Sequence, residues 1–378
     1  MTPRLCVLVP SHWEALMGGS EYQAKVLIEF LLAHHDVEVV YLTAHDKPGF
    51  TPEGYRIVRF SDRRGFRRYG AFFDAFRLYR ALEELKPDLI VQFVGCAHTG
   101  IAAFYAQRHR CRMIWRVTSD RSLIAERTPR WHLHRRLERA FLNYGIRNAH
   151  AIVAQTRNQQ RMLSARFGRD DAIVVPNFHP LPAERPQPPR EDQRVVWIGN
   201  LNRTKNPAAF VRLAAKFAAS PDVKFTMAGA PNDDPWTAEQ LALIRSTPNL
   251  EYLGKLTQDE VNSLLERATV LVNTSEHEGF ANTFIQAWLR HVPVASLHVD
   301  PDGLLSRVGL GSVAGSEEQL ALDVARRLET PAAERAALGA RCRAYAAANH
   351  SEANISTIAR LLAVPPLPPT TTPGRIAA

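Results

Sequence analysis

One segment of the chain concentrates polar side chains between two apolar runs. It reads VLVNTSEHEGFANTFIQAW, from Val270 to Trp288, and predicts a buried strand, a polar turn and a helix that begins near Asn282. Glu278 stands in the turn, and Gln286 follows it eight positions later, on the helix face of Asn282. Such a segment offers a carboxylate to sugar hydroxyls, backbone N–H groups to a phosphate and an amide to a ribose. The alternative is an exposed turn acid followed by a solvent-facing helix residue.

A second group of candidate residues follows another expected strand, Val195 to Gly199. Gly199 gives a tight exit, and Arg203 and Lys205 bring two cations into the loop before a helix expected at Pro207 to Ala219. Open α/β sheets bind ligands at the carboxyl ends of their strands, and two cations at that edge suit a diphosphate. The alternative is a solvated loop whose basic residues are incidental.

A glycine pair follows the first expected strand, Leu5 to Val9. Gly18 and Gly19 precede a helix expected at Ser20 to Ala33, and glycines at such a turn let backbone N–H groups approach a phosphate. The alternative is a plain tight turn in which Ser20 caps the helix. The turn is not a GxGxxG motif, which disfavours a nicotinamide dinucleotide site.

The elements that must position these residues alternate along the chain. Short apolar runs separated by amphipathic stretches predict parallel strands joined by helices, hence an α/β fold with two Rossmann-like doubly wound domains. Strands are expected at Leu5–Val9, Val37–Leu42, Leu89–Phe93, Met113–Val117, Ala151–Ala154, Ile173–Val175, Val195–Gly199, Lys224–Ala228 and Val270–Asn273, with further helices at Arg135–Arg147, Ser316–Leu328 and Ala332–Leu362.

Proline-dense segments predict the domain limits. Residues 181–192 are rich in proline and charge and read as a linker between a first domain, 1–180, and a second, 193–344. A helix at about 345–363 is expected to pack back on the first domain, and the Pro/Thr-rich tail 364–378 is expected to be disordered.

Composition narrows the class of protein. The 378 residues are 46% hydrophobic and 22% charged, which excludes wholesale disorder and a fibrous rod, and the net charge of +9 favours an anionic partner. The four cysteines form neither a C-x-x-C pair nor a zinc-type cluster, so no metal is expected and a reducing, cytoplasmic compartment fits best. The apolar run at the N-terminus is too short for an expected signal peptide, and no apolar run reaches membrane-spanning length, so any membrane contact is expected to be peripheral.

Two basic stretches, 63–80 and 127–139, contain interleaved aromatic residues. They suit the inner face of an anionic membrane that carries a lipid-linked acceptor. A nucleic-acid partner is not expected, because no RRM, KH or helix-turn-helix signature accompanies them. The other interpretation is a solvated helix face over a phenylalanine core.

Together these motifs resemble the family 4 glycosyltransferases with the GT-B fold, in which two Rossmann-like domains face each other across a cleft. The resemblance rests on Gly18-Gly19, GNLNRTK at 199–205, EGFANTFIQAW at 278–288, PVASLHVDPDGLL at 293–305 and the stretch 151–177, and so covers nearly the whole chain. It implies a retaining enzyme that uses a nucleotide-diphosphate sugar, binds this donor mainly on its C-terminal domain and needs no metal or other cofactor. The expected acceptor is a glycan or a lipid-linked glycan in cell-surface polysaccharide or glycoconjugate synthesis.

The resemblance assigns roles to individual residues. Gly19 and Lys205 match the glycine and lysine that meet the diphosphate, and Glu278 matches the first acid of a paired-glutamate motif that holds the sugar. The implied donor-binding set is Gly18, Gly19, Gly199, Asn200, Arg203, Lys205, Glu278, Gly279, Phe280, Ala281, Asn282, Thr283 and Gln286.

The chain departs from the family pattern at three places. Asn200 stands where the family has an arginine, with Arg203 as a substitute cation, and Gln286 replaces the second glutamate. The stretch Thr118-Ser119-Asp120 lies where relatives have a histidine near the sugar, which makes Asp120 the candidate for that catalytic position beside Glu278 and Lys205. His98 is either an acceptor-side residue or a structural one.

The resulting hypothesis is electrostatic catalysis of sugar transfer with retention of configuration. Lys205 and Arg203 would stabilise the leaving diphosphate, and Glu278 would hold the sugar ring. Two alternatives remain: a GT-B sugar-nucleotide epimerase, for which no clear acid/base pair is found, and a catalytically silent subunit that binds a nucleotide sugar, which Asn200 and Gln286 would suit.

Overall fold

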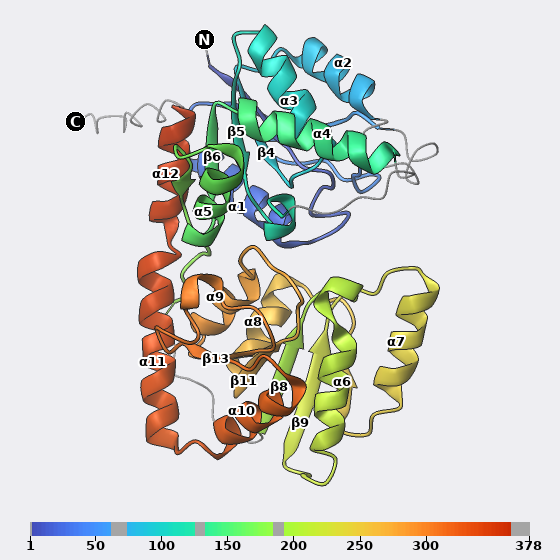
Figure 1. Ribbon diagram of the computed structural model, residues 1–378, viewed down its shortest axis with the longest axis vertical. Coiled ribbons are helices and arrows are strands. Elements are labelled where there is room, and N and C mark those ends of the chain that lie inside the picture. Colours follow the sequence, from blue (N-terminus) through green and yellow to red (C-terminus); the bar gives the residue numbers. More distant parts are fainter. Residues whose placement is uncertain (1, 62–73, 125–132, 184–192, 364–378) are drawn as a thin grey trace, which may run out of the picture.

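The computed structural model describes residues 2–61, 74–124, 133–183 and 193–363. Within these ranges the chain forms two lobes, one above the other in Figure 1, and each lobe is built around a parallel sheet flanked by helices. This arrangement confirms the predicted α/β fold with two Rossmann-like doubly wound domains. The tail from residue 364, residues 184–192 of the predicted linker, and residues 63–73 and 127–132 of the two basic stretches lie outside the described residues.

The first sheet has seven parallel strands in the order β3-β2-β1-β4-β5-β6-β7. Its strands are β1 (Arg4–Leu8), β2 (Glu38–Thr43), β3 (Tyr55–Arg59), β4 (Leu89–Phe93), β5 (Arg112–Arg116), β6 (Ala151–Ala154) and β7 (Ile173–Val174). Its helices are α1 (Gly19–His34), α2 (Ala75–Leu85), α3 (Ala97–Arg108), α4 (Leu133–Asn148) and α5 (Arg157–Phe167), with a 3-10 turn η1 (Asp120–Ser122) after β5. The edge strand β3 was not predicted, because its partly exposed sequence YRIVR contains no apolar run.

The second sheet has six parallel strands in the order β10-β9-β8-β11-β12-β13. Its strands are β8 (Gln193–Ile198), β9 (Val223–Ala228), β10 (Leu250–Tyr252), β11 (Val270–Asn273), β12 (Val294–Ser296) and β13 (Gly311–Val313). Around them lie α6 (Pro207–Lys216), α7 (Pro235–Arg245), α8 (Gln258–Glu266), α9 (Asn282–Trp288) and α10 (Glu317–Glu329), with 3-10 turns η2 (Arg203–Lys205) and η3 (Pro301–Gly303). The strands β10, β12 and β13 have three residues each, too few to give a periodic signal.

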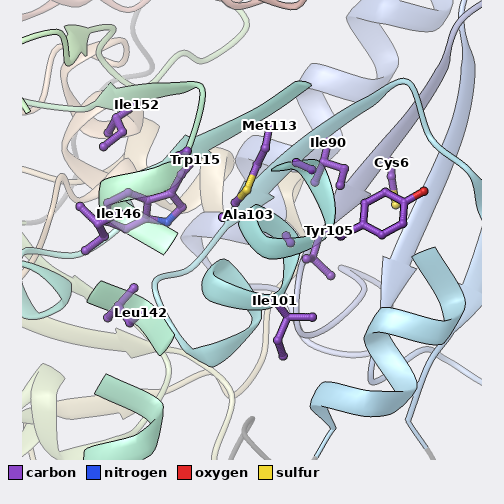
Figure 2. Close-up of a cluster of buried hydrophobic side chains, with 14 of the residues drawn as sticks. Cys6, Ile90, Ile101, Ala103, Tyr105, Met113, Trp115, Leu142, Ile146 and Ile152 are labelled. Atoms are coloured by element: carbon purple, nitrogen blue, oxygen red, sulfur yellow. The ribbon is translucent and has the colours of Figure 1, made fainter. Parts of the chain in front are cut away.

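Both faces of the first sheet are buried, which explains its continuous apolar strands. Leu5 and Val7 pack in a cluster with α1, whereas Cys6 and Leu8 pack in a second cluster with α2, α3 and α4. Figure 2 shows part of the second cluster, in which labelled side chains include Met113 and Trp115 of β5 and Leu142 and Ile146 of α4. The central strands are therefore rigid supports for the loops at their carboxyl ends.

The C-terminal helical segment is two helices, not the single one predicted from Ala332 to Leu362. α11 (Ala332–Asn349) ends at His350, and α12 (Glu352–Leu362) continues along the side of the molecule to the first domain in Figure 1. The break is held by hydrogen bonds: the backbone N–H of His179 donates to the His350 carbonyl at 2.9 Å, and His350 Nδ1 donates to the Asn177 carbonyl at 2.7 Å. α12 packs against α1 and contributes to its apolar cluster, so the chain returns to the first domain.

Candidate functional site

Lys205 and Glu278 form an ion pair at the carboxyl edge of the second sheet. The Lys205 ammonium contacts Glu278 Oε1, and the hydroxyl of Ser275 donates to the same oxygen at 2.7 Å. The two side chains are 27% and 14% exposed, so the pair is partly shielded from water without being closed to a ligand. The sequence predicted both residues, whereas Ser275 was not recognised as a partner.

The loop that carries Lys205 is tied to the loop that carries Glu278. Asn202 caps η2 by accepting a hydrogen bond from the Lys205 backbone N–H at 3.1 Å, and Thr274 donates its hydroxyl to the Lys205 carbonyl at 2.7 Å. Trp197 Nε1, on β8, in turn donates to the Thr274 hydroxyl at 2.9 Å. These bonds fix the backbone of Lys205, so the ammonium starts from a defined position.

Glycines at the ends of β8 and β9 allow these two strands to approach closely. A Cβ added to Gly229 would lie 1.8 Å from the Gly199 carbonyl oxygen, and the Gly199 N–H donates to Ala228 at 3.0 Å. Gly229 was missed from the sequence; the signal was a glycine directly after the expected strand at Lys224 to Ala228.

Two further candidates in this loop face other partners. Arg203 is exposed, and its guanidinium lies over the ring of Trp236, 5.0 Å from the ring centroid. Asn200 donates its side-chain amide to the carbonyl of Met17, in the first domain, at 3.1 Å. The residue that replaces the family arginine therefore joins the two domains in this structure.

The glycine turn before α1 meets the start of α9 across the domain boundary. Asn282 Nδ2 donates to the Gly19 carbonyl at 3.0 Å, and Asn282 Oδ1 accepts from Asn177 Nδ2 at 2.8 Å. A Cβ on Gly19 would lie 3.3 Å from Asn282 Nδ2, so the approach is close. Asn177 was not predicted as a site residue; it ends the stretch 151–177, to which the resemblance assigns no role.

The helix α1 begins at Gly19 with Gly18 as its N-cap, so Ser20 is not the capping residue. The carboxyl group of Glu21, which is only 9% exposed, lies beside the backbone of Gly18. Burial raises the pKa of this carboxyl from 4.5 to about 7. An acid thus occupies part of the position where the glycine motif predicted phosphate.

Gly279 brings the second domain onto the backbone of the first. A Cβ at this position would lie 2.6 Å from the Thr118 carbonyl oxygen and 2.5 Å from Gln155 Oε1. The neighbouring Phe280 and Ala281 are buried, and Phe280 packs on Trp288 and His350. The turn that was predicted to face phosphate therefore also forms the domain contact.

A cavity of about 420 Å³ lies between the domains beside this contact. Glu278 and Gly279 line it from the second domain, and Asp120 and the start of α5 line it from the first. The two candidate carboxylates of the sequence, Asp120 and Glu278, thus share one cavity. Its other charged lining residues are Arg161, Glu276, Asp300, Asp302 and Arg307.

Asp120 is positioned by α5. Gln159 Nε2 donates to Asp120 Oδ1 at 2.8 Å, and the side-chain oxygen Oε1 of Gln159 accepts from the Gln155 backbone N–H at 2.8 Å. Burial raises the pKa of Asp120, and the Gln159 hydrogen bond and the charge of His277 act in the opposite direction.

The remaining predicted residues lie in different surroundings. Gln286 is 5% exposed and its Nε2 has no hydrogen-bond partner within the described part of the chain, and Thr283, at the second position of α9, is half-buried. His98 is 3% exposed, packs edge-on against Phe60 at 5.1 Å between ring centroids, and does not line the cavity. Burial lowers the pKa of His98 to about 4, so its ring is neutral.

Neither a cluster of candidate metal ligands nor a membrane-spanning helix is found in the ranges that the structure describes. Among the residues that the structure describes, no group of three or more His, Cys, Asp or Glu side chains could hold a metal ion. None of the helices in those ranges combines the length and apolarity needed to cross a bilayer.

Known structures share this architecture. Sucrose-phosphate synthase of Thermosynechococcus elongatus superposes with a TM-score of 0.76 at 16% identity, covering 95% of this chain and 98% of that one. HepE of Anabaena, solved with UDP and glucose, gives 0.74 at 16% identity, with coverage of 96% and 99%. WaaG, a glycosyltransferase involved in lipopolysaccharide biosynthesis, gives 0.75 at 14% identity, with coverage of 95% and 99%.

The two parallel-sheet domains and the cleft between them define a protein of the GT-B fold class. Residues 17–181 match Glycosyltransferase Family 4 and residues 192–329 match Glycosyl transferases group 1. The chain therefore belongs to the family 4 (group 1) glycosyltransferases. It is 28% identical over 213 residues to a 2-deoxystreptamine glucosyltransferase of Streptomyces kanamyceticus, a match that spans 50% of this chain and 54% of that protein.

Proposed function

We propose that this glycosyltransferase transfers a sugar from a nucleotide-diphosphate donor to a hydroxyl group of an acceptor, with retention of configuration. The observation that carries the proposal is the Lys205–Glu278 pair, whose carboxylate lines the same cavity as Asp120 of the other domain. HepE, a neighbour in fold, was solved with UDP and UDP-glucose, which supports a nucleotide-sugar donor.

The ion pair suggests how the donor is received. In the free protein Glu278 neutralises Lys205; an arriving diphosphate would take the ammonium and release Glu278 to accept hydrogen bonds from sugar hydroxyls. Ser275 would keep the carboxylate in place during this exchange. As the glycosidic bond breaks, negative charge grows on the leaving diphosphate, where a fixed cation stabilises it.

Gln286 is the proposed contact to the ribose. Its buried Nε2 lacks a partner in the described residues, and a ribose hydroxyl would supply one. Arg203, which stacks on Trp236, remains a proposed second cation for the diphosphate, and Asp120 remains the proposed catalytic carboxylate near the sugar. No metal or other cofactor is invoked, and the departing phosphate would take the acceptor proton.

The cavity wall favours an acceptor that is not phosphorylated. Its charged residues are five carboxylates against two arginines, so an amine-bearing acceptor is attracted, a neutral polyol is admitted and a phosphate group on the acceptor is repelled. The glucosyltransferase relative is named for 2-deoxystreptamine, an amine-bearing polyol, and WaaG for lipopolysaccharide biosynthesis. A glycan or lipid-linked acceptor for cell-surface polysaccharide synthesis in the cytoplasm is compatible with this chemistry, provided that the accepting sugar carries no phosphate.

Peripheral membrane contact is a separate proposal for the first domain. Phe76 on α2 and Leu133 on α4 are 76% and 62% exposed and lie beside basic residues of the same helices. Flotation with anionic and with neutral vesicles tests it: binding to anionic vesicles that disappears at high salt is expected, and failure to float with either contradicts it.

The donor proposal is tested by a thermal-shift panel of nucleotide sugars followed by product analysis with and without acceptors. Stabilisation by at least one nucleotide sugar and acceptor-dependent sugar transfer with the anomeric configuration kept are expected. Conversion of the donor sugar without acceptor would indicate the epimerase alternative. Binding without turnover under every acceptor would indicate the silent subunit.

A further inference from the structure

The second domain places a carboxylate on the start of a helix of the first domain. Asp302, in η3, accepts hydrogen bonds from two successive backbone N–H groups of α5: Arg157 donates to Oδ2 at 2.7 Å and Asn158 to Oδ1 at 3.0 Å. Free N–H groups at a helix start carry partial positive charge, so a carboxylate with both oxygens engaged there is well stabilised.

The turn that carries Asp302 has a backbone conformation and hydrogen bonds that leave the Asp302 carboxylate available for α5. Asp302 has φ 51° and ψ 20°, in the left-handed region that aspartate tolerates better than most residues. The guanidinium of Arg307 donates to the Asp302 carbonyl, and Asp300 accepts from the Leu305 and Ser306 backbone N–H groups at 2.8 and 3.2 Å. Bonds within the second domain therefore hold the backbone of the turn, which leaves the Asp302 carboxylate for α5.

The same first turn of α5 holds Asp120. Gln159 follows Asn158 directly and donates to Asp120 Oδ1, so one turn of helix links Asp302 to the candidate catalytic carboxylate. Asp120, Asp302 and Glu278 all line the cavity between the domains.

We propose that Asp302 is a positioning residue that holds the domains closed, so that Asp120 of the first domain and Glu278 of the second face one substrate. The importance of these two carboxylates rests on the proposed function, whereas the closing contact itself can be measured without any substrate. Domain closure of this kind assembles a site and excludes water from it. Bonds across the cleft, such as those of Asp302, favour the closed arrangement.

The helix itself does not depend on Asp302. Thr156 caps α5 by accepting from the Gln159 backbone N–H at 3.1 Å, so loss of Asp302 leaves the Arg157 and Asn158 N–H groups to water. A variant at position 302 is therefore expected to fold, and its effect is expected on the domain arrangement.

The test compares Asp302→Ala, Asp302→Asn and a matched control, Ser316→Ala. Asparagine keeps one acceptor oxygen and also tolerates the left-handed backbone conformation, but it carries no charge. Ser316 caps α10 within the second domain, where it accepts from the Gln319 N–H at 3.2 Å, so its loss removes a cap without touching the domain boundary.

X-ray scattering of the ligand-free proteins is expected to show a larger radius of gyration for Asp302→Ala than for wild type, an intermediate value for Asp302→Asn and no change for Ser316→Ala. With UDP-glucose as the first donor probe, or another donor that the panel identifies, kcat/KM is expected to fall about tenfold in Asp302→Ala, mainly through KM, with partial recovery in Asp302→Asn.

Wild-type scattering and kcat/KM in Asp302→Ala, or the same losses in Ser316→Ala, would overturn the proposal. If wild type turns over no nucleotide sugar, the proposed function fails, and the scattering comparison still decides whether Asp302 closes the domains.

Discussion

Lys205 and Glu278 are 73 residues apart in the chain, yet their charged groups meet in an ion pair to which Ser275 adds a hydrogen bond. Two loops, one after β8 and one after β11, bring them together, because these strands are neighbours in the second sheet. The pair places a cation and a carboxylate where a diphosphate and its sugar would meet.

Replacement of Lys205 by Met is expected to lower kcat by about 10²- to 10³-fold, because no fixed cation would then stabilise the leaving diphosphate. Glu278→Ala is expected to lose most turnover as well, through loss of the sugar contact. Steady-state kinetics and thermal melting check both variants together. Undiminished transfer by either folded variant would refute the role of that residue.

Gly279→Ala is expected to impair activity without unfolding either domain. The added methyl would lie 2.6 Å from the Thr118 carbonyl, a backbone atom of the opposite domain that cannot rotate away. The domains must therefore separate, and kcat/KM is expected to fall at least tenfold while the melting temperature changes by only a few degrees.

The matched control is Gly168→Asn, at the C-cap of α5. Gly168 has φ 64°, where asparagine is tolerated, and a Cβ there meets no atom within 4 Å. Wild-type kinetics are expected for this variant. An active Gly279→Ala enzyme would show that the domain contact at this turn is not needed.

The sequence predicted the parts of the fold that depend on local pattern. Strands β4, β6 and β11 have the predicted ends, because each is a short, mainly apolar run; β6 and β11 are bounded by polar residues, and β4 begins after Asp88 and ends shortly before Gly95. The break between α11 and α12 could not be predicted, since His350 is held by Asn177 and His179, which lie far away in the sequence. Asn349, His350 and Ser351 are only weak helix formers, and these tertiary hydrogen bonds fix the break at His350.

The site was predictable only where each motif carries its own chemistry. Lys205 and Glu278 were found because a charged residue after a buried strand is informative by itself. Asn177 and Asp302 were missed because each has a partner in the other domain, and a contact across a cleft leaves no periodic signal in the chain.

We predict that Arg116 contributes to donor binding and that its buried charge lowers the free energy of unfolding. It is 1% exposed, donates to Asn177 Oδ1 at 2.9 Å, and contacts no carboxylate within the described residues. Burial lowers the pKa of its guanidinium to about 9, as expected for an uncompensated buried cation. Arg116→Met is therefore expected to melt at or above the wild-type temperature, because the buried charge is gone.

The same variant is expected to bind donor less well. Without Arg116, Asn177 keeps the bond from Gln155 but loses its charged partner, and Asn177 holds Asn282 at the start of α9. Calorimetric melting and kinetics measured on one preparation separate the two effects. A fall in melting temperature together with an unchanged donor KM would contradict both parts of the prediction.

The buried carboxyl group of Glu21 is expected to make the free energy of unfolding fall as the pH rises. The carboxyl has a pKa of about 7 in the folded protein and an ordinary value of 4.5, so between these limits the folded state holds a proton that the unfolded state has lost. The stabilising contribution is full below pH 4.5 and is lost as the pH rises through 7. A difference of this size corresponds to roughly 3 kcal/mol in the free energy of unfolding.

Glu21→Gln removes this titration and keeps a side-chain oxygen beside the backbone of Gly18. The free energy of unfolding of this variant, relative to wild type, is therefore expected to rise by roughly 3 kcal/mol between pH 4.5 and pH 8. Urea unfolding of both proteins at these two pH values measures the difference directly, and all other titrating groups cancel in the comparison. A constant difference across this range would mean that Glu21 titrates normally, and hence that its carboxylate reaches water at the mouth of the glycine turn.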